Sequence, residues 1–393
     1  IPSDINLGFE PQFLLVKRAD STGSWNLFDT MRGFHGEKVG NNKYVRPNNS
    51  NAEGNNASVD GEFITSTGFG ANGNGVTGSA NATFIYLAIR RGPMKEPDAG
   101  TDVYIQDESH STTYESPFFQ SPWPVDLGIY RQIDGTAGNY ASARITGTGY
   151  LITQSTAISN PDNATLWDYM NGYYDLGSGA YSGYAAILLR RYPKVFDVVV
   201  YTGAGAGTHT HNLKAVPEMM IIKCTSHSNR WIVYSAALGN TKQLHLDEDI
   251  AETTGQFNDT TPTASVFSVS DNTQSGTSGR TYVNYLFATL AGVSKVGTYT
   301  GTGNTLNVDC GFSGGARFVM IKRTDSTGDW YVFDTTVQGI IAGDDPYWLM
   351  NSNAADVTNT DYIDPHSSGF TITSSAPAAL NASSGTYLFL AFS

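Results

Sequence analysis

The chain has 393 residues and a formal net charge of −13, and only 15% of its residues are charged. This length predicts several domains, and the acidic balance excludes a nucleic-acid partner, which needs clustered Lys and Arg. No apolar run reaches the roughly 18 residues of a membrane-spanning helix, so we expect no membrane insertion.

The composition favours strands over helices. The chain holds 42 Gly and 22 Tyr, together with many Thr, Ser and Asn, and these residue types are typical of strands and tight turns. Long helical runs of Ala, Glu, Lys and Leu are missing. We therefore expect an all-β fold with little helix.

The first clear element is a β-hairpin at residues 16–29, VKRADSTGSWNLFD. Two short apolar runs flank Asp-Ser-Thr-Gly, and this order suits a type I turn closed by a residue with positive φ. Similar segments recur at 221–235 and 321–334, and a degenerate copy begins at Ile129, with Arg131 near the lysine position and Tyr140 near the tryptophan position. In the three clear copies the lysine precedes the tryptophan by eight residues: Lys17 and Trp25, Lys223 and Trp231, Lys322 and Trp330.

A second repeated element is an apolar strand that ends at Ile89, Leu189, Phe287 and Phe392. Its near-continuous apolar character is typical of a strand buried between two sheets. The spacing of about 100 residues is a common domain size. We expect a tandem array of four β-sandwich units of jelly-roll or lectin-like type, stacked as a stiff rod by short connections: unit one (1–93), a divergent unit two (94–194), unit three (195–293) and unit four (294–393).

A third repeated element, YTGAG at Tyr201 and YTGTG at Tyr299, precedes the hairpin in units three and four. Unit one lacks this segment. We therefore expect that sequence upstream of Ile1 supplies the first strand of unit one.

The repeated polar residues of the hairpin do not predict catalysis. Lys17, Asp20 and Asp29 recur at the end of the chain, but the third copy carries Ser226 and Ser235 in place of the two carboxylates. Turn capping and cross-strand pairing explain these residues better. Because no nucleophile, phosphate-binding or zinc motif is present, we expect no enzyme, no cofactor and no metal.

Three further groups allow two interpretations each. His209 and His211 lie two residues apart and are either metal ligands or ordinary residues of an exposed strand. The acidic segments 247–249 and 343–346 are either calcium loops or solvated surface. Cys224 and Cys310 lie in apolar runs, so we expect buried free thiols, although the sequence does not exclude a disulfide.

Aromatic residues crowd unit two. If LWDYMNGYYD (166–175) is a strand, Trp167, Tyr169 and Asn171 share one face, while Asp168, Met170 and Gly172 share the other. Together with Tyr173 and Tyr174, these aromatics form either a core or subunit interface, or a platform for sugar stacking.

Several runs carry a resemblance to a known family: FDVVVYTGAGAGTHTHNLKAVPEMMIIK (196–223), LFATLAGVSKVGTYTGTGN (286–304), CGFSGGARFVMIKRTDSTGDWYVFDT (310–335) and DYIDPHSSGFTITSSAPAALNASSGTYLFLAF (361–392). They resemble a repeat domain of uncharacterised function found in tail-fibre and other virion structural proteins of tailed bacteriophages. The resemblance is strong for units one, three and four and weak for unit two. It implies a virion location, and the family has no agreed catalytic residues to transfer.

Together these observations lead us to expect a bacteriophage virion structural protein. We expect a tail-fibre or tail-associated component that serves as a rigid spacer and host-surface adhesin. Its expected partners are other virion proteins, copies of itself in a homotrimer, and a host surface glycan. A capsid-surface decoration protein is the first alternative, and a glycan-degrading enzyme with a pair of carboxylates is the second.

Overall fold

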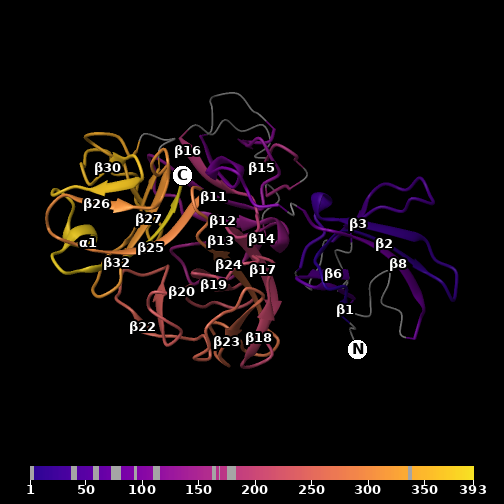
Figure 1. Cartoon of the computed structure of the whole chain (residues 1–393). Helices are drawn as coiled ribbons and strands as arrows, with labels where there is room; N and C mark the ends of the chain where they lie inside the picture. The colour runs from indigo at the N-terminus through magenta and orange to yellow at the C-terminus, as the bar shows by residue number, and fades with distance from the viewer. Residues whose placement is uncertain are drawn as a thin grey trace.

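The computed structural model describes residues 4–36, 42–55, 62–71, 81–92, 95–108, 116–161, 165–167, 169–174, 183–334 and 339–393. Within these ranges the chain is an all-β protein of antiparallel sheets that form β-sandwich units, as predicted (Figure 1). The one α-helix described is α1 (Ala378–Asn381), and no helix in the described part is long and apolar enough to cross a membrane. The 3-10 helices are η1 (Thr30–Arg32), η2 (Gly100–Asp102) and η3 (Arg144–Thr146). We keep the four predicted ranges as names for the units.

Unit one is a sandwich of two three-stranded sheets, ordered β3-β2-β8 and β1-β7-β6, with a small β4-β5 pair beside them. Its strands are β1 (Ile5–Asn6), β2 (Pro11–Arg18), β3 (Trp25–Asp29), β4 (Lys43–Tyr44), β5 (Gly54–Asn55), β6 (Glu62–Thr65), β7 (Gly68–Ala71) and β8 (Phe84–Arg90).

Unit two pairs a six-stranded sheet, ordered β14-β13-β12-β11-β16-β9, with a β10-β15 ribbon. Its strands are β9 (Tyr104–Glu108), β10 (Phe119–Gln120), β11 (Leu127–Gln132), β12 (Tyr140–Ala143), β13 (Gly149–Ile152), β14 (Asn160–Pro161), β15 (Gly172–Tyr173) and β16 (Tyr184–Leu189).

Unit three repeats this plan, with a sheet ordered β17-β24-β19-β20-β21-β22 and a β18-β23 ribbon. Its strands are β17 (Phe196–Thr202), β18 (Gly207–Thr210), β19 (Met219–Cys224), β20 (Ile232–Ser235), β21 (Lys242–His245), β22 (Thr253–Thr254), β23 (Val266–Val269) and β24 (Thr281–Phe287).

Unit four has a five-stranded sheet, ordered β25-β32-β27-β28-β29, and a three-stranded sheet, ordered β26-β31-β30. Its strands are β25 (Ser294–Thr300), β26 (Leu306–Asp309), β27 (Phe318–Arg323), β28 (Trp330–Asp334), β29 (Trp348–Leu349), β30 (Ile363–His366), β31 (Gly369–Ile372) and β32 (Thr386–Phe392).

The hairpin prediction is confirmed in the three clear copies. Lysine and tryptophan lie directly opposite each other in the Cα register at Lys17–Trp25 and Lys322–Trp330. In unit two Tyr140 lies near the tryptophan position, as expected, but one residue away from it. Because Tyr130 pairs with Tyr140, the residue opposite Arg131 is Asn139, and a one-residue shift in a strand moves a side chain to the other face of the sheet.

The last strand of each unit is central in units two, three and four but not in unit one. β16, β24 and β32 each pair with the first strand of the unit on one side and with the hairpin on the other. β8 pairs with β2 alone among the described residues, because no described strand takes the place of β9, β17 or β25. The expectation that each closing strand is buried is therefore wrong for β8, whose Leu87 is 56% exposed.

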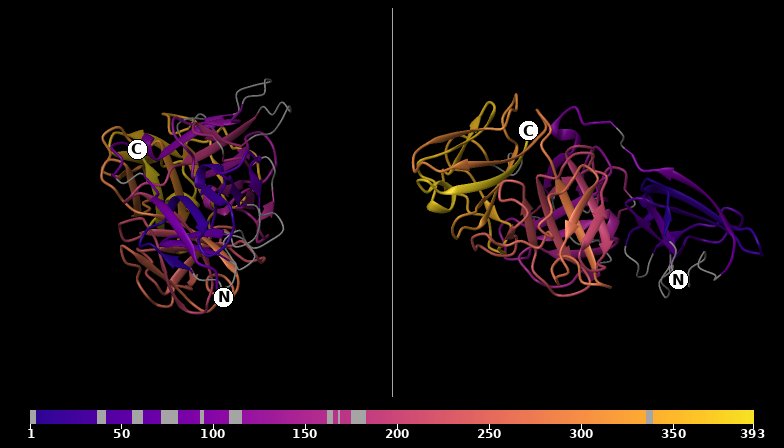
Figure 2. Two further views of the ribbon diagram at one scale, coloured as in Figure 1. Left: turned by 90° about the vertical axis from the view of Figure 1, so that its right-hand side faces the viewer. Right: turned by 60° about the horizontal axis from the view of Figure 1, so that its bottom comes forward.

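Units two, three and four do not form a linear rod. Their large sheets face one another around one shared hydrophobic core. Unit one, in indigo, lies to one side, and the same buried cluster extends to its residues Phe34 and Ile64 (Figures 1 and 2). Each of these sandwiches also has an inner core of its own. Short connections place successive units next to each other, but they do not determine whether the units stack in a line or pack around a centre. Here the outer sheet faces are apolar, and burying them favours packing around a centre.

Candidate functional site

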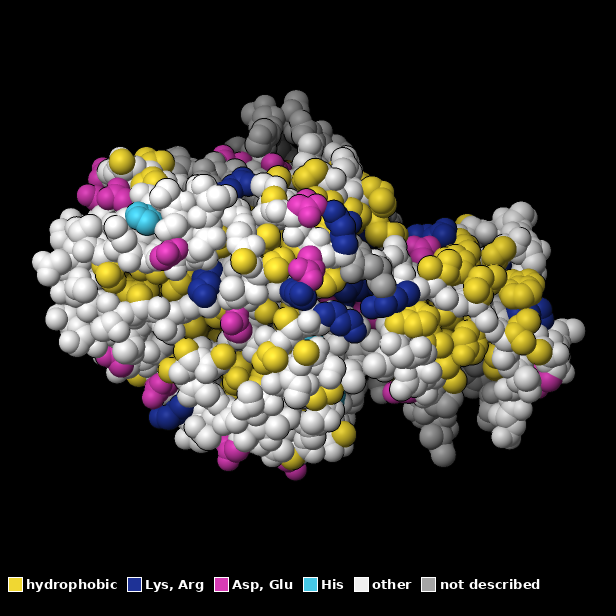
Figure 3. All heavy atoms as spheres, in the orientation of Figure 1, with side chains coloured by type: hydrophobic (Ala, Val, Ile, Leu, Met, Phe, Trp, Pro, Cys, Tyr) yellow, Lys and Arg dark blue, Asp and Glu magenta, His cyan; other side chains and the backbone are white. Residues whose placement is uncertain are grey.

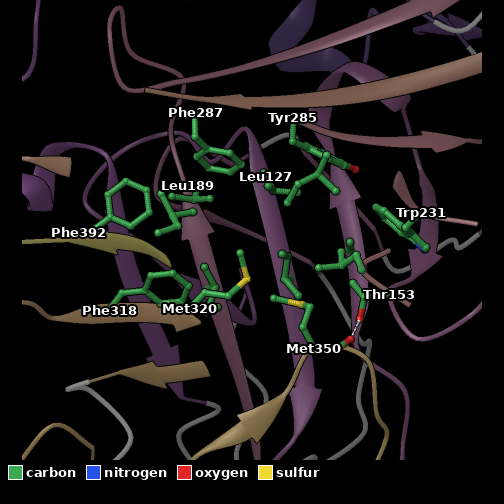
Figure 4. Close-up of a pocket in the computed structure, with 16 residues that line it drawn as sticks. Leu127, Thr153, Leu189, Trp231, Tyr285, Phe287, Phe318, Met320, Met350 and Phe392 are labelled. Carbon is green, nitrogen blue, oxygen red and sulfur yellow. Dashed lines mark hydrogen bonds between the residues drawn. The ribbon is translucent and has the colours of Figure 1, made fainter. Parts of the chain in front are cut away.

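The centre of the three-unit body is an apolar core to which each unit contributes the outer face of its large sheet (Figure 4). The residues in this core occupy alternate positions of the hairpin and closing strands, because side chains alternate between the two faces of a strand. They enclose an apolar cavity of about 50 Å³. Examples are Leu127 and Leu189 from unit two, Tyr285 and Phe287 from unit three, and Phe318, Met320 and Phe392 from unit four.

A ring of side-chain hydrogen bonds closes around this core. The residue opposite the hairpin cation is Trp330 in unit four, Trp231 in unit three and Asn139 in unit two, and all three are buried. Each donates to a backbone carbonyl of the adjacent unit. The acceptors are the last residues of β21 in unit three, β13 in unit two and β29 in unit four. The bonds are Trp330 Nε1 to His245 O (2.8 Å), Trp231 Nε1 to Ile152 O (3.1 Å) and Asn139 Nδ2 to Leu349 O (3.0 Å).

The hairpin cations make a second ring of contacts between the same units. Lys322 Nζ donates to the carbonyls of Asp249 and Ile250 at 3.2 and 2.9 Å, and Lys223 Nζ donates to the carbonyl of Thr156 at 3.0 Å. Arg131 forms an ion pair with Asp356 of unit four. Burial lowers the pKa of Lys223 and of Lys322 to about 8, because a desolvated ammonium group is less favourable than a neutral amine.

Backbone hydrogen bonds join the same three pairs of units, with the donor and acceptor units exchanged. In each case the N–H donor follows strand β13, β21 or β29, and the carbonyl belongs to the residue directly after the cation-bearing strand β19, β27 or β11 of another unit. The bonds are Ser159 N to Thr225 O (2.9 Å), Glu252 N to Thr324 O (3.0 Å) and Asp356 N to Ile133 O (2.9 Å). The repeated sequence therefore encodes an association surface as well as a hairpin.

Unit one is attached to the body through a buried cluster of charges. The Arg191 guanidinium contacts both carboxylate oxygens of Glu10, at 2.7 and 2.8 Å, and Asp197 at 2.7 Å. Arg91 lies 3.3 Å from Glu10 and 3.6 Å from Asp197. Burial alone raises the pKa of Asp197, but Arg191 and Arg91 outweigh it and hold this pKa below its usual value. Such a cluster holds only while both signs of charge are present.

A cleft of about 350 Å³ lies between units one and three. Its walls are rich in hydroxyl groups, and the Ser66 and Thr210 hydroxyls are hydrogen bonded across it. Hydroxyl groups both donate and accept hydrogen bonds, so these walls suit a neutral polar molecule. The hydroxyl-bearing residues that line it are Thr65, Ser66, Thr67, Tyr201, Thr202, Thr208 and Thr210.

Of the two candidate histidines, His209 lies on the partly exposed strand β18 and His211 follows it directly. His209 lines the cleft and contacts Tyr201 in a tilted arrangement with the ring centroids 4.1 Å apart, and burial lowers the pKa of His209 to about 4. His211 is buried, with Nε2 3.0 Å from the Thr263 carbonyl and Nδ1 accepting from the Leu213 N–H at 3.3 Å. Both nitrogens of His211 are thus engaged. No group of three or more His, Cys, Asp or Glu that could hold a metal occurs in the described ranges.

The aromatic residues of unit two lie mostly in its own core. Trp167, Tyr173 and Tyr174 are buried, Trp167 stacks on Tyr173 at 4.9 Å, and its Nε1 donates to the Gly147 carbonyl at 2.7 Å. Tyr169 is half-buried, with its hydroxyl 2.5 Å from Ser116 Oγ. The segment before Gly172 is not a strand where it is described, so the predicted alternation does not apply; Asp168 lies outside the described residues.

The acidic segments are not simply solvated. Asp345 is buried, accepts from the Ile341 N–H at 2.8 Å, and has its pKa raised to about 7 by burial. The Asp247 carboxylate accepts from the Trp231 N–H at 3.0 Å. Both anchor loops of the sandwich units. The prediction of buried free thiols at Cys224 and Cys310 is confirmed.

The chain is thus a multi-unit β-sandwich protein whose repeated hairpin builds the contacts between units. A family model described as a domain of unknown function, DUF7483, matches residues 4–93 and 192–393. The chain belongs to this family, and the match covers units one, three and four but leaves out most of unit two. No curated protein and no solved structure matches the chain.

Proposed function

We propose that this protein is a structural component of a bacteriophage virion, most suited to a tail fibre or tail-associated part, where it serves as a rigid spacer. The observation that carries the proposal is the ring in which units two, three and four each cover the apolar sheet face of a neighbour. A shared core couples the units, because no unit can move without exposing apolar surface to water. The resemblance of the repeat to virion proteins supports the same function.

The adhesin part of the proposal places a host glycan in the cleft between units one and three. Its hydroxyl-rich walls and the half-buried ring of His209 match the hydrogen-bonding and stacking that sugars require. Binding on a glycan array that is lost in Thr208→Val together with Thr210→Val supports this site. Binding that persists in the double variant places the glycan elsewhere.

Immunogold electron microscopy tests the virion location. An antibody raised against the chain should label the tail or tail fibres of particles released by the bacterium that carries the gene. Label spread over the head favours capsid decoration, and the absence of label from particles overturns the proposal. Release of reducing sugar ends from host polysaccharide, lost when one carboxylate is neutralised, points instead to a glycan-degrading enzyme.

A further inference from the structure

The outer sheet face of unit one matches the faces that meet in the three-unit core, but nothing in the described part of the chain covers it. The closing strands of units one and four can be aligned through the hairpin lysine. Lys17 pairs with Ile85 and Lys322 pairs with Leu388, so Ile85 corresponds to Leu388. The aligned side chains differ sharply in exposure. Ile85, Leu87 and Ile89 are 51%, 56% and 53% exposed, whereas Leu388, Leu390 and Phe392 are 1%, 3% and 1% exposed.

The hairpin of unit one keeps the contacts made within a unit and lacks those made between units. The Trp25 N–H donates to Asn48 Oδ1 at 3.0 Å, as the Trp330 N–H does to Asn351 Oδ1 at 2.9 Å. Lys17 Nζ donates to the Arg18 carbonyl, as Lys322 Nζ does to that of Arg323. The Trp25 indole and the Lys17 ammonium have no partner in another unit among the described residues.

The surface is continuous. Ile85, Leu87 and Ile89 alternate along β8, and the partly exposed Leu15 and Leu27 lie beside them on β2 and β3, opposite each other in register. Figure 3 shows hydrophobic side chains gathered over this part of unit one. An apolar patch of this kind on a solvent-exposed protein surface marks an association site. We call the outer side of β3-β2-β8 the open face.

We propose that the open face binds the same face of unit one in two other copies of this chain, giving a homotrimer whose centre repeats the ring of units two, three and four. The internal ring shows which partner fits: it consists of three units, each presenting this face to its neighbours. A set of three identical units closes in the same way with cyclic symmetry.

The internal ring also predicts one atomic contact. In unit one Val45 pairs with Leu27 of the hairpin, and in unit three Leu244 pairs with the equivalent residue, Val233. The residue after Val45, Arg46, therefore corresponds to His245. Because Trp330 Nε1 donates to the His245 carbonyl, the Trp25 indole of one copy donates to the Arg46 carbonyl of the next. This proposal is argued from the internal ring alone and does not depend on the proposed virion location. A monomeric chain would contradict the trimer but would not affect the proposed virion location.

Light scattering coupled to size exclusion tests the trimer with the full chain. At roughly 100 μM, well above the dissociation constant of an ordinary specific complex, the expected molar mass is three times 42.3 kDa. A monomer or a dimer at this concentration overturns the proposal.

Matched variants locate the interface. Leu87→Asp puts a charge on the open face and is expected to give a monomer with an unchanged circular dichroism spectrum, because Leu87 is exposed in the single chain. Val216→Asp changes an apolar side chain of similar exposure, 47%, in unit three and should leave the trimer intact. Trp25→Phe removes the donor and keeps most of the aromatic surface, so it should weaken association about ten-fold. A trimer that survives Leu87→Asp contradicts the assignment.

Discussion

The indole nitrogen of Trp330 lies 2.8 Å from the backbone carbonyl of His245, although the two residues belong to different β-sandwich units. This bond is one step of a ring in which every unit of the body donates to the adjacent one. The hairpin repeated along the chain therefore packs on both faces: one face lies in the core of its own sandwich, and the other contacts a neighbouring unit.

Trp330→Ala is predicted to lower the free energy of unfolding of the three-unit body by about 3–5 kcal/mol, since it empties a fully buried aromatic site. Trp330→Phe keeps most of the packing and removes the donor, so we expect a smaller loss of about 1–2 kcal/mol. Denaturant unfolding monitored by circular dichroism measures both. Equal losses in the two variants would contradict the importance of the hydrogen bond.

The buried lysines predict that stability rises with pH in the alkaline range. The pKa of Lys223 and Lys322 is about 8 when folded and 10.5 when exposed. Between these values the unfolded state binds more protons, so the free energy of unfolding increases with pH there and the full burial penalty applies below pH 8. Buried tyrosines such as Tyr299, whose pKa is raised by burial, oppose the rise above about pH 10.

Lys322→Met tests this pH dependence. Because one of two shifted lysines is removed, the slope of stability against pH between about 8 and 9.5 should fall by roughly half. Denaturant midpoints measured across this range give the slope. A variant with the wild-type slope would show that Lys322 does not titrate as its burial requires.

Arg191→Leu is predicted to cost about 3–5 kcal/mol, because it leaves Glu10 and Asp197 buried with only the more distant Arg91 as a counter-charge. The loss should appear as detachment of unit one, detected as faster proteolysis between units one and two. Arg18→Leu is the matched control: its ion pair with Asp20 is exposed to solvent, so its loss should change stability little. Similar effects of the two variants would refute the role of the buried cluster.

One edge of β8 has no partner strand among the described residues, and this edge predicts that an added strand will stabilise unit one. In unit three, four residues (203–206) separate β17 from β18, and residues 1–4 precede β1, the equivalent of β18. Fusing Ser294–Thr300, the β25 sequence, directly before Ile1 therefore places a strand beside β8. We expect slower amide hydrogen exchange in residues 84–90. The same fusion with Pro at its third and fifth residues should not protect them, and equal protection by both would show that no strand pairing occurs.

The sequence predicted the local structure well. The spacing of Lys322 and Trp330 implied a hairpin, and the two residues are register partners. It did not predict that both face another unit, because alternation in a strand tells which residues share a face but not what covers that face. Asn139 was missed because Tyr140 looks more like tryptophan, yet Tyr140 stacks at 4.8 Å on Tyr130 of the inner core while Asn139 reaches unit four.

The aromatic and histidine candidates show the same limit. Trp167 and Tyr173 are aromatic enough for a ligand site, but their positions in the core of unit two depend on packing from distant strands. The cleft between units one and three combines Gly36 with residues 4–6, 63–67, 199–202 and 208–210. Of these, only His209 was a candidate site residue in the sequence, because Ser and Thr hydroxyls carry no pattern of their own. Site residues brought together by unit docking need the tertiary structure.

The central claim is that units two, three and four form one cooperative body through the repeated hairpin. Hydrogen exchange measured by mass spectrometry at rising denaturant concentration tests it most directly, because exchange reports which segments open together. We predict that residues 184–189, 281–287 and 386–392 lose protection at one common concentration, and that residues 84–90 lose it earlier. Three separate concentrations for the three closing strands would contradict the shared core.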